Sequence, residues 1–342
     1  MTRTLAAGDG ARIAWWSAEG GAVPAIAAWR AVGAATRPGE DGSPCVRVHR
    51  RFAQGIVGVF DGLGGAGARD AWQLPGDEKP LTGAHVAANV ASLACHRWYA
   101  DGERHSASLA QALHATLVHA DELSNAPRQA IRGSAMRTMP TTVAVIRFEE
   151  FGDGIRAMAM SAGDSRCYLL RPATGLQQLS VDDTRVPDAL VALRESPPMT
   201  QVAGADRPFE LREAVHICDP PLVLLVATDG YFDYVETPHQ LELECLRALA
   251  AAETFADWAE GLARYAAEHA RDDASLAAAC FGFADLPAFR SAFAKRLAAL
   301  EQLEADTLQR ADPARPEARE QARAEAWERY RTLYEALLEV PA

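Results

Sequence analysis

Acidic residues stand next to short apolar stretches at widely separated positions in this chain of 342 residues. They are Asp61, Asp164, Asp229 and Asp272, with the pair Glu40 and Asp41 in a turn before the first buried stretch. Carboxylates that gather in one cleft lose hydration and repel one another, so without a counter-charge some of them would take up protons. A hard divalent cation removes this cost, and coordination by carboxylates and water suits Mg²⁺ or Mn²⁺. If folding brings these residues together, they predict an oxygen-ligand metal site.

Each acidic position also has a simpler interpretation. An Asp-Gly pair at the end of a strand is more often a turn than a metal ligand. Taken singly, Asp61-Gly62 and Gly163-Asp164 would both be interpreted as turns, and Glu40-Asp41 is the weakest signal of all. The prediction therefore depends on the whole set. Gly62 adds to it because a backbone carbonyl can approach a cation there without a Cβ in the way.

The acidic residues can meet only if strands and helices place them at one edge, and the apolar patterns indicate such elements. Short β-like runs predict strands around Trp15-Trp16 and over residues 25–32, 56–60, 142–148, 156–161, 167–171, 222–227 and 275–283. Single apolar stripes predict helices near 82–100, 106–124, 238–250 and 253–270, with Ser106 as a cap of the second. Glycine breaks at 152–154 and 163–164 suggest antiparallel hairpins. The polar, Pro-rich residues 182–220 indicate an irregular surface excursion.

The order of these elements is strands, two helices, strands, two helices and a last strand. A doubly wound parallel sheet would alternate strand and helix steadily, so this order predicts an α+β layered fold with antiparallel sheets inside.

The C-terminal residues have a different composition, rich in Ala, Glu, Arg and Leu. Apolar residues at helical spacing, from Phe289 to Leu300 and from Trp327 to Leu337, predict two helices that the Pro-containing stretch 312–316 separates. We expect residues 285–342 to form a helical hairpin appended to a domain of residues 1–284. The hairpin, over residues 286–342, would either dock against its own core or mediate self-association or binding to a partner.

Composition narrows the classes of function. Acidic residues outnumber basic ones 46 to 34, and the net charge of −12 opposes binding to nucleic acid or anionic lipid, since both need clustered Lys and Arg. No apolar stretch approaches the roughly 20 residues that span a bilayer, and residues 1–5 lack the apolar segment of a secretory signal. The six cysteines are scattered without a Cys-x-x-Cys pair. We therefore expect a reduced, cytoplasmic setting.

Four ordered motifs resemble those of the metal-dependent protein phosphatases, the type 2C serine/threonine phosphatase family. They are Asp61 to Gly65, Thr141-Thr142 with Gly163 to Arg166, Thr228 to Asp233, and Asp272 to Ser275. Order and spacing agree from about residue 25 to residue 284. The resemblance, which is to bacterial members in particular, implies a four-layer α-β-β-α sandwich with two antiparallel sheets, to which the C-terminal helical hairpin is added.

The resemblance also implies metal ligands on the first motif and on the turn before it. Asp61 would bridge two ions of Mg²⁺ or Mn²⁺. The Gly62 carbonyl and the Glu40 side chain, partly through water, would bind one of these ions. Asp41 matches the second acid of the family's Glu-Asp pair and would support this site.

The later motifs would complete the ligand set. Asp229 and Asp272 would hold the second ion, and Asp164, Asp229 and Asp233 would bind a third, weaker one. Family members usually place a phosphate-binding arginine four residues before the metal-linked glutamate. Arg37 lies three residues before it and is assigned to this role, with a solvated turn arginine as the alternative.

The activity implied is hydrolysis of phosphoserine and phosphothreonine in proteins, opposite a Ser/Thr kinase. Two cations roughly 3.5–4 Å apart lower the pKa of a bridging water and orient it for direct attack on phosphorus, so no phosphoenzyme is needed. Many eukaryotic members carry a histidine after Asp-Gly that protonates the leaving group. Leu63 stands in that place, as bacterial members commonly have a methionine there, so the leaving-group acid is unassigned.

Two other classes of function were weighed against this hypothesis. A catalytically silent module of the same fold would bind or regulate through its C-terminal helices, but degenerate relatives lose metal carboxylates and this chain keeps them. A nucleotide-binding protein that uses residues 62–67 as a phosphate cradle is a poor match. The segment has neither Gly-Lys-Ser/Thr nor G-x-G-x-x-G after the strand.

Overall fold

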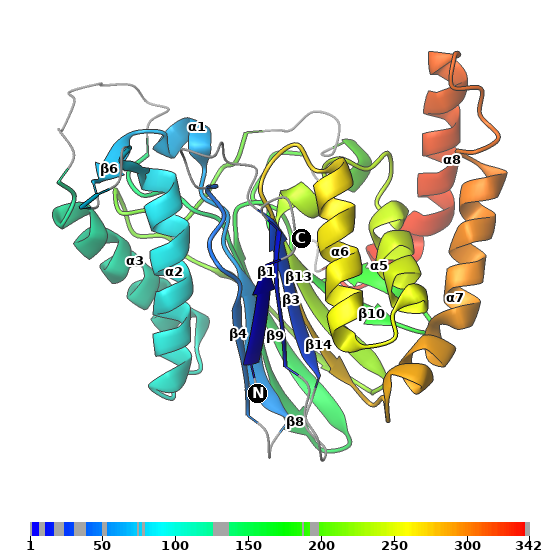
Figure 1. Cartoon of the computed structure of the whole chain (residues 1–342), viewed down its shortest axis with the longest axis horizontal. Helices are drawn as coiled ribbons and strands as arrows, with labels where there is room; N and C mark the ends of the chain where they lie inside the picture. The colour runs from blue at the N-terminus through cyan, green and yellow to red at the C-terminus, as the bar shows by residue number, and fades with distance from the viewer. Residues whose placement is uncertain are drawn as a thin grey trace.

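Two antiparallel β-sheets packed face to face form the centre of the protein (Figure 1). The computed structural model describes residues 24–30, 39–49, 53–73, 75–76, 79–125, 137–186, 188–191 and 198–338, with the backbones of two strands within residues 2–16. The first sheet has the spatial order β1 (Thr2–Ala6), β2 (Ala11–Trp16), β3 (Ala25–Arg30), β14 (Ala274–Phe281), β13 (Leu222–Ala227), β10 (Arg166–Arg171) and β11 (Gly175–Gln178). The second has the order β12 (Arg212–Cys218), β9 (Gly154–Ala162), β8 (Val143–Phe151), β5 (Gln54–Val59) and β4 (Cys45–His49).

Helices cover the outer face of each sheet (Figure 1). Helices α2 (Gly83–Ala100) and α3 (Ser106–Glu122) pack on the five-stranded sheet, and α5 (His239–Ala251) and α6 (Phe255–His269) pack on the seven-stranded one. Three apolar layers result, one between the sheets and one under each helix pair. This arrangement confirms the expected α+β fold, a four-layer α-β-β-α sandwich with two antiparallel sheets.

The buried strands follow from their sequences. Every residue of β13 is buried, because one face packs on the other sheet and the opposite face lies under helices. Uninterrupted apolar runs are expected wherever both faces of a strand are covered. Helix α6 begins with a capping box in which Thr254 and Asp257 satisfy each other's backbone N–H groups, which fixes where the helix begins.

Short elements lie near the acidic residues. They are α1 (Gly64–Gly67), the two-stranded sheet of β6 (Asp70–Trp72) and β7 (Leu81–Thr82), and the 3₁₀ turn η1 (Asp229–Tyr231). Thr82 caps α2 by accepting a hydrogen bond from the backbone N–H of His85, at 3.1 Å. Local turns therefore connect the sheet edge to the helices on both sides.

Three sequence-based expectations were wrong. The hairpin at 152–154 is present, since β8 and β9 pair directly, but Gly163-Asp164 is not a hairpin: it carries the chain from β9 in one sheet to β10 in the other. The stretch 182–220 contains β12, an edge strand paired with β9. Ser106 lies inside α3, and its N-cap residue, His105, makes no side-chain capping bond. Residues 31–32 of an expected strand lie outside the described residues.

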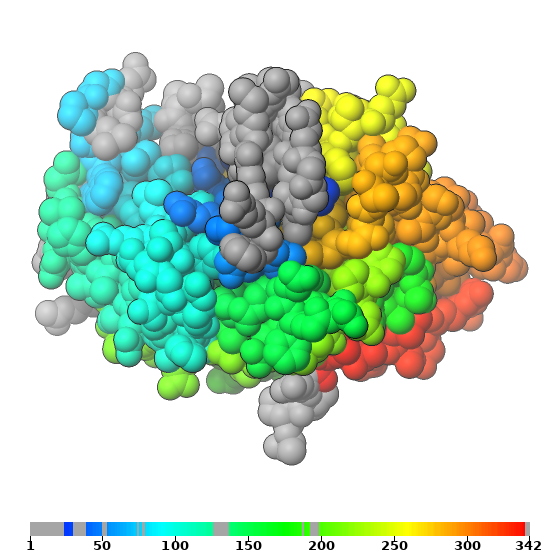
Figure 2. Space-filling view, turned by 90° about the horizontal axis from the view of Figure 1, so that it is seen from below, coloured from blue at the N-terminus to red at the C-terminus, as the bar shows by residue number. Residues whose placement is uncertain are grey.

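The two expected C-terminal helices are present as α7 (Leu286–Asp306) and α8 (Pro316–Tyr334). They lie at the opposite end of the molecule from α2 and α3 (Figure 1), and Figure 2 shows their orange and red residues on the far side of the green ones from the cyan residues. Phe289 and Phe293 of α7 and Tyr330 and Tyr334 of α8 belong to the apolar layer under α5 and α6. The hairpin is therefore docked on its own core. In the part of the chain that the structure describes, we find no helix of the length and apolarity that crossing a bilayer requires.

Candidate metal centre

The predicted acidic residues lie at one end of the stacked sheets, where several strands begin or finish. The end of β13 pairs with the beginnings of β14 and β10, so the turns that carry Asp229, Asp272 and Asp164 lie at the same end of the sheet. Asp61 follows β5 in the other sheet, and its backbone carbonyl accepts a hydrogen bond from Thr142 N–H at 2.7 Å. Antiparallel pairing thus gathers residues that are far apart in sequence.

Asp61 and Asp229 lie at the centre of the cluster. Burial raises the pKa of Asp61 well above its usual range, and the charges of Asp229, Asp41 and Asp164 raise it further. The pKa of Asp229 is raised in the same way, first by burial and then by Asp164 and Asp233. Such mutual effects require short separations between the groups. The structure therefore brings these five predicted residues together.

The carboxylates around Asp61 and Asp229 differ in their exposure and in their pKa. Burial is the largest cause that raises the pKa of Asp41 to about 7, of Asp233 to about 7 and of Asp164 to about 6. One buried oxygen each of Asp41 and Asp164, the Oδ1 atom, has no hydrogen-bond partner among the described residues. Asp272 is exposed, and its charge adds to those that act on Asp229. Buried polar oxygens without partners need an explanation such as an ion.

The loop that carries Glu40 and Asp41 is held by backbone and side-chain hydrogen bonds. Thr82 Oγ1 donates to Glu40 Oε1 at 2.9 Å, and Gly62 N–H donates to the Glu40 carbonyl at 3.2 Å. The Asp273 carboxylate accepts from the backbone N–H of Glu40 and from that of Asp41, the latter at 3.3 Å. A Cβ on Gly62 would lie 2.6 Å from the Glu40 carbonyl oxygen, so glycine is needed for this close approach of two backbone segments.

The threonine pair of the second motif connects Asp61 to the β9–β10 crossover. Asp61 N–H donates to Thr142 Oγ1 at 3.1 Å, and Thr141 Oγ1 donates to the Asp61 carbonyl at 2.9 Å. The hydroxyls of Thr142 and Ser165 share a hydrogen bond of 2.6 Å. Asp61 and the residue that follows Asp164 are therefore fixed relative to each other.

The crossover is also held from the flap, the segment between Asp182 and Pro220. Arg166 forms a bidentate ion pair with Asp182, at 2.7 to 3.1 Å, and its guanidinium lies 4.2 Å from the centre of the Phe232 ring. Gly163 has φ of +95° and donates its N–H to Asp183 Oδ2 at 3.1 Å. The positive φ suits glycine and lets the chain pass from one sheet to the other.

Sequence reasoning gave no role to four residues that surround the cluster. Thr228 Oγ1 donates to Asp41 Oδ2 at 3.0 Å, and Thr82 and Asp273 hold the Glu40 loop as described above. Tyr234 is exposed, and burial followed by the charges of Asp272 and Asp229 raises its pKa. The signals available were the N-cap position of Thr82 and the places of Thr228 and Asp273 inside motifs. Tyr234 directly follows a motif and has no other sequence signal.

Two other residues of the sequence hypothesis stand apart from the cluster. Arg37 lies outside the described residues. Leu63 precedes α1 and donates its backbone N–H to the Pro140 carbonyl at 3.3 Å. Its aliphatic side chain has no proton to donate to a leaving group.

The donor set fits hard divalent cations in its chemistry. The cluster consists of carboxylate oxygens, the ligand type that Mg²⁺ and Mn²⁺ prefer, and a cation would remove the repulsion that raises the pKa values. It would also give a partner to the orphaned Oδ1 atoms of Asp41 and Asp164. Within the described ranges, no three acidic, histidine or cysteine side chains converge into a closed coordination set. The fit therefore rests on donor chemistry and on burial.

Comparisons with known proteins agree with the fold. No family model matches the chain, and no curated protein matches it. Solved structures of bacterial serine/threonine phosphatases do match, with the Mycobacterium tuberculosis phosphatase PstP/Ppp at a TM-score of 0.52 and 18% identity over 76% of this chain and 98% of that one. A structure of the PstP catalytic domain with two manganese ions gives 0.50 and 21%, with 76% and 98% covered. The phosphatase MsPP of Mycobacterium smegmatis, of the PPM type and in complex with cacodylate, gives 0.52 and 18%, with 75% and 98% covered.

These likenesses establish the architecture of the chain. The two stacked sheets with helices on both outer faces are those of the PPM serine/threonine phosphatases, and the resemblance noted from the motifs is confirmed at the level of the fold.

Proposed function

We propose that the protein is a divalent-cation-dependent phosphatase that hydrolyses phosphoserine and phosphothreonine in proteins. The observation that carries this proposal is the cluster of half-buried carboxylates around Asp61 and Asp229, with two orphaned oxygens, on a phosphatase fold. The cluster lies at the strand ends, where Asp61 and Asp229 are half-buried and Asp272 is exposed, so one side of it is open to solvent. Manganese in the PstP structure supports the choice of cation.

The ligands proposed are those that the motifs suggested. Asp61 would bridge two ions of Mg²⁺ or Mn²⁺, with Glu40 and the Gly62 carbonyl on one of them and Asp41 in support. Asp229 and Asp272 would hold the other.

A third ion and the phosphate group would have their own residues. Asp164, Asp229 and Asp233 would bind the third, weaker ion, and Arg37 would bind phosphate. The exposed position of Asp272 and the half-buried position of Asp61 suit an arrangement in which one side of the cluster faces the substrate.

The chain itself would orient and stabilise the reacting groups. Bound divalent ions would supply an activated water, as the motifs suggested, and would stabilise charge on the phosphoryl oxygens. Thr142 and Thr228 hold Asp61 and Asp41 by hydrogen bonds, which keeps the carboxylates in place while charge develops. The reaction transfers the phosphoryl group to water and releases the serine or threonine hydroxyl together with inorganic phosphate.

We further propose the organisation and setting that the sequence suggested. Residues 1–284 would form the phosphatase domain and residues 285–342 an extension, in a cytoplasmic protein that acts opposite a Ser/Thr kinase. The observed docking of α7 and α8 supports the intramolecular role of the extension over self-association.

The test is turnover of a phosphate monoester and of phosphoserine and phosphothreonine peptides by the purified full chain with Mn²⁺. We expect activity that EDTA abolishes and that Asp229→Asn reduces to background. Asp153→Asn is the matched control, because Asp153 is an exposed acid in the β8–β9 turn, and it should keep full activity.

Other outcomes would contradict the proposal. Turnover that survives both EDTA and Asp229→Asn would exclude metal-dependent catalysis at this cluster. Absence of turnover together with absence of Mn²⁺ binding by calorimetry would favour a catalytically silent module.

A further inference from the structure

The acidic cluster has two halves with different support. The loop half comprises Glu40, Asp41 and Asp61, and the crossover half comprises Asp164, Asp229 and Asp233. Hydrogen bonds within the sandwich hold the loop half. The segments that carry the crossover half continue directly into residues that contact the C-terminal hairpin of α7 and α8.

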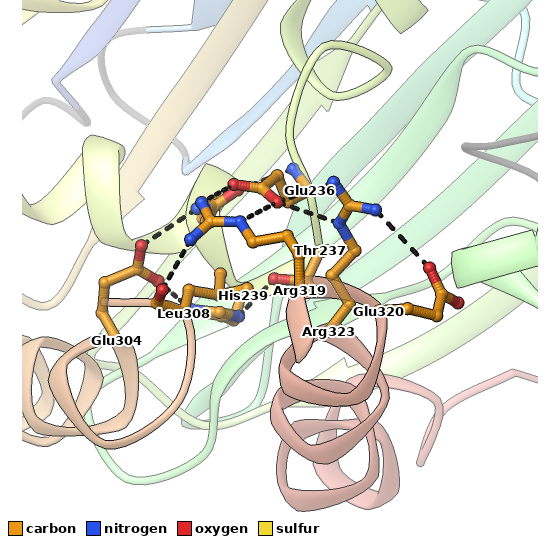
Figure 3. Close-up of polar contacts among 9 residues, drawn as sticks. Glu236, Thr237, His239, Glu304, Leu308, Arg319, Glu320 and Arg323 are labelled. Carbon is orange, nitrogen blue, oxygen red and sulfur yellow. Dashed lines mark hydrogen bonds and ion pairs between the residues drawn. The ribbon is translucent and has the colours of Figure 1, made fainter. Parts of the chain in front are cut away.

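The first contact is made by Glu236, three residues after Asp233 and before α5 (Figure 3). Its carboxylate forms ion pairs with two arginines from successive turns of α8. Arg319 Nε and Arg323 Nε lie 2.8 and 2.9 Å from Glu236 Oε2, and Arg319 makes a second bond to Oε1. Arg319 also donates to the Leu308 carbonyl at 2.6 Å, so it connects Glu236 with both ends of the α7–α8 connection.

The second contact is a buried network at the start of α5. His239 is completely buried, with Nε2 2.7 Å from Glu304 Oε2 on α7 and Nδ1 2.6 Å from Thr237 Oγ1 (Figure 3). Gln240 donates to the same Glu304 carboxylate at 3.1 Å and accepts from Glu236 N–H at 2.7 Å. The segment between Asp233 and α5 is thus tied to both helices of the hairpin.

The third contact lies beneath Asp164. Arg166 follows it by two residues, is 2% exposed, and is stacked on Phe232, the residue before Asp233. Tyr168 on the same strand packs against Phe232 and against Tyr334 at the end of α8, with ring centres 6.4 and 6.2 Å apart. The beginning of β10 and the turn after β13 carry the crossover half. They are therefore packed together through Tyr168 and Phe232, and Tyr168 contacts Tyr334 of α8.

We infer that the docked hairpin is a positioning element for the crossover half, and that Glu236 is its main positioning residue. The observations that carry this are the convergence of Arg319 and Arg323 on Glu236 and the shared packing of Phe232, Tyr168 and Tyr334. Loosening the hairpin would release the segment 229–240 and leave the loop half in place. The inference deepens the proposed function, on which it rests for the identity of the bound ion.

Charge exchange across the Glu236 contact tests the inference without removing the hairpin. Glu236→Arg faces two arginines and should undock this part of α8, and Arg319→Glu with Arg323→Glu should do the same. The triple variant that combines all three changes restores opposite charges and should restore docking. Arg315→Glu is the control, because Arg315 is an exposed arginine whose ion pair among the described residues is with Asp312, in the connection before α8. Glu236→Gln, which keeps the shape and removes the charge, replaces Glu236→Arg if the latter does not fold.

The first readout is hydrogen exchange of metal-free protein. We expect faster exchange over residues 229–240 in the reversed variants, recovery in the triple variant, and unchanged exchange over residues 39–62 in all of them. Unchanged exchange over residues 229–240 in the reversed variants would overturn the inference.

The second readout is Mn²⁺ binding by calorimetry, with phosphatase kinetics beside it. We expect the Mn²⁺ concentration needed for half-saturation to rise about tenfold in the reversed variants, as for other changes in groups that orient metal ligands. The KM for a phosphopeptide should stay unchanged. Equal Mn²⁺ binding in wild type and variants would contradict the inference and leave the proposed function intact. A wild-type protein that binds no Mn²⁺ would contradict the proposed function, and hydrogen exchange would still decide the role of the hairpin.

Discussion

The loop half and the crossover half of the acidic cluster reach the same sheet edge by different means. The loop half is held by hydrogen bonds from threonine hydroxyls and backbone N–H groups within the sandwich, such as Thr142 to Asp61 and Thr228 to Asp41. The crossover half shares part of this support through Ser165 and Thr228, and it is held in addition by ion pairs and aromatic contacts with the flap and the C-terminal helices, through Arg166 and Glu236. The sandwich alone therefore holds the loop half, whereas the crossover half depends also on the flap and the C-terminal helices.

This difference indicates where control of the protein can act. The hydrogen bonds of the loop half lie inside the packed sandwich, where little water competes for them. Ion pairs with helix α8 are partly exposed, and partly exposed pairs are sensitive to salt and to competing partners. The crossover half is therefore the part of the site whose geometry can change while the fold persists.

The largest effect should come from Asp61→Asn, which removes the loop-half carboxylate that interacts with Asp229 and Asp164 of the crossover half. We expect turnover to fall about 10³-fold, because metal stabilisation of the transition state is worth several kcal/mol. The metal-free variant should unfold at a higher temperature than metal-free wild type, since a buried and repelled carboxylate is lost. Initial rates and thermal unfolding measure the two changes. A variant that keeps its turnover, or that is less stable without metal, would show that Asp61 is not the common ligand of the halves.

The next effect concerns pH and metal together. Burial raises the pKa of Asp41 to about 7 and of Asp233 to about 7, one residue in each half. Because these raised values make the folded state bind more protons than the unfolded state, the stability of metal-free protein should fall as pH rises from about 4 to 7. Saturating Mn²⁺ should reduce or reverse this trend, since the ion replaces the protons. Thermal unfolding at several pH values, with EDTA or Mn²⁺, tests it. A stability of the EDTA-treated protein that rises over this range would show that the carboxylates are not protonated in the fold.

Most strands of the sandwich could be predicted from the sequence, because strands that are buried appear there as short apolar runs. The run over residues 222–227 agrees with β13 at both ends, since a strand covered on both faces is apolar throughout. Strand β12 was not predicted. It is an edge strand with alternating exposure, and its polar residues resemble those of the irregular flap before it. Its pairing with β9 is a long-range contact that leaves little trace in local composition.

The sequence predicted which acidic residues gather, and it did not predict the contacts that hold them. Asp61, Asp164 and Asp229 were found because each follows a strand, and strand ends can be read from the sequence. The Gly163-Asp164 turn was assigned to a hairpin because a hairpin and a crossover between sheets use the same residues locally. The contacts of Glu236 with Arg319 and of Asp273 with the Glu40 loop join residues 83 and 233 positions apart. Such pairings depend on how the layers pack.

The smallest expected effect is on the free energy of unfolding when either of two glycines with positive φ is replaced. Comparing the two replacements measures how tightly the loop half and the crossover half are joined. Gly163 has φ of +95° and a Cβ there would lie 2.9 Å from Thr142 Cγ2, whereas Gly152 has φ of +60° and open space around it. Gly152→Ala should cost about 1 kcal/mol from backbone strain alone. Gly163→Ala should cost about 2–3 kcal/mol, because overlap with Thr142 is added to that strain.

Urea unfolding of the two variants gives the free energies, and Mn²⁺ titration shows whether Asp164 has moved. We expect only Gly163→Ala to need more Mn²⁺ for half-saturation, since Thr142 also holds Asp61. Equal costs and equal Mn²⁺ requirements would mean that the crossover tolerates displacement from Thr142. The two halves of the cluster would then be coupled through the bound ions and not through the protein.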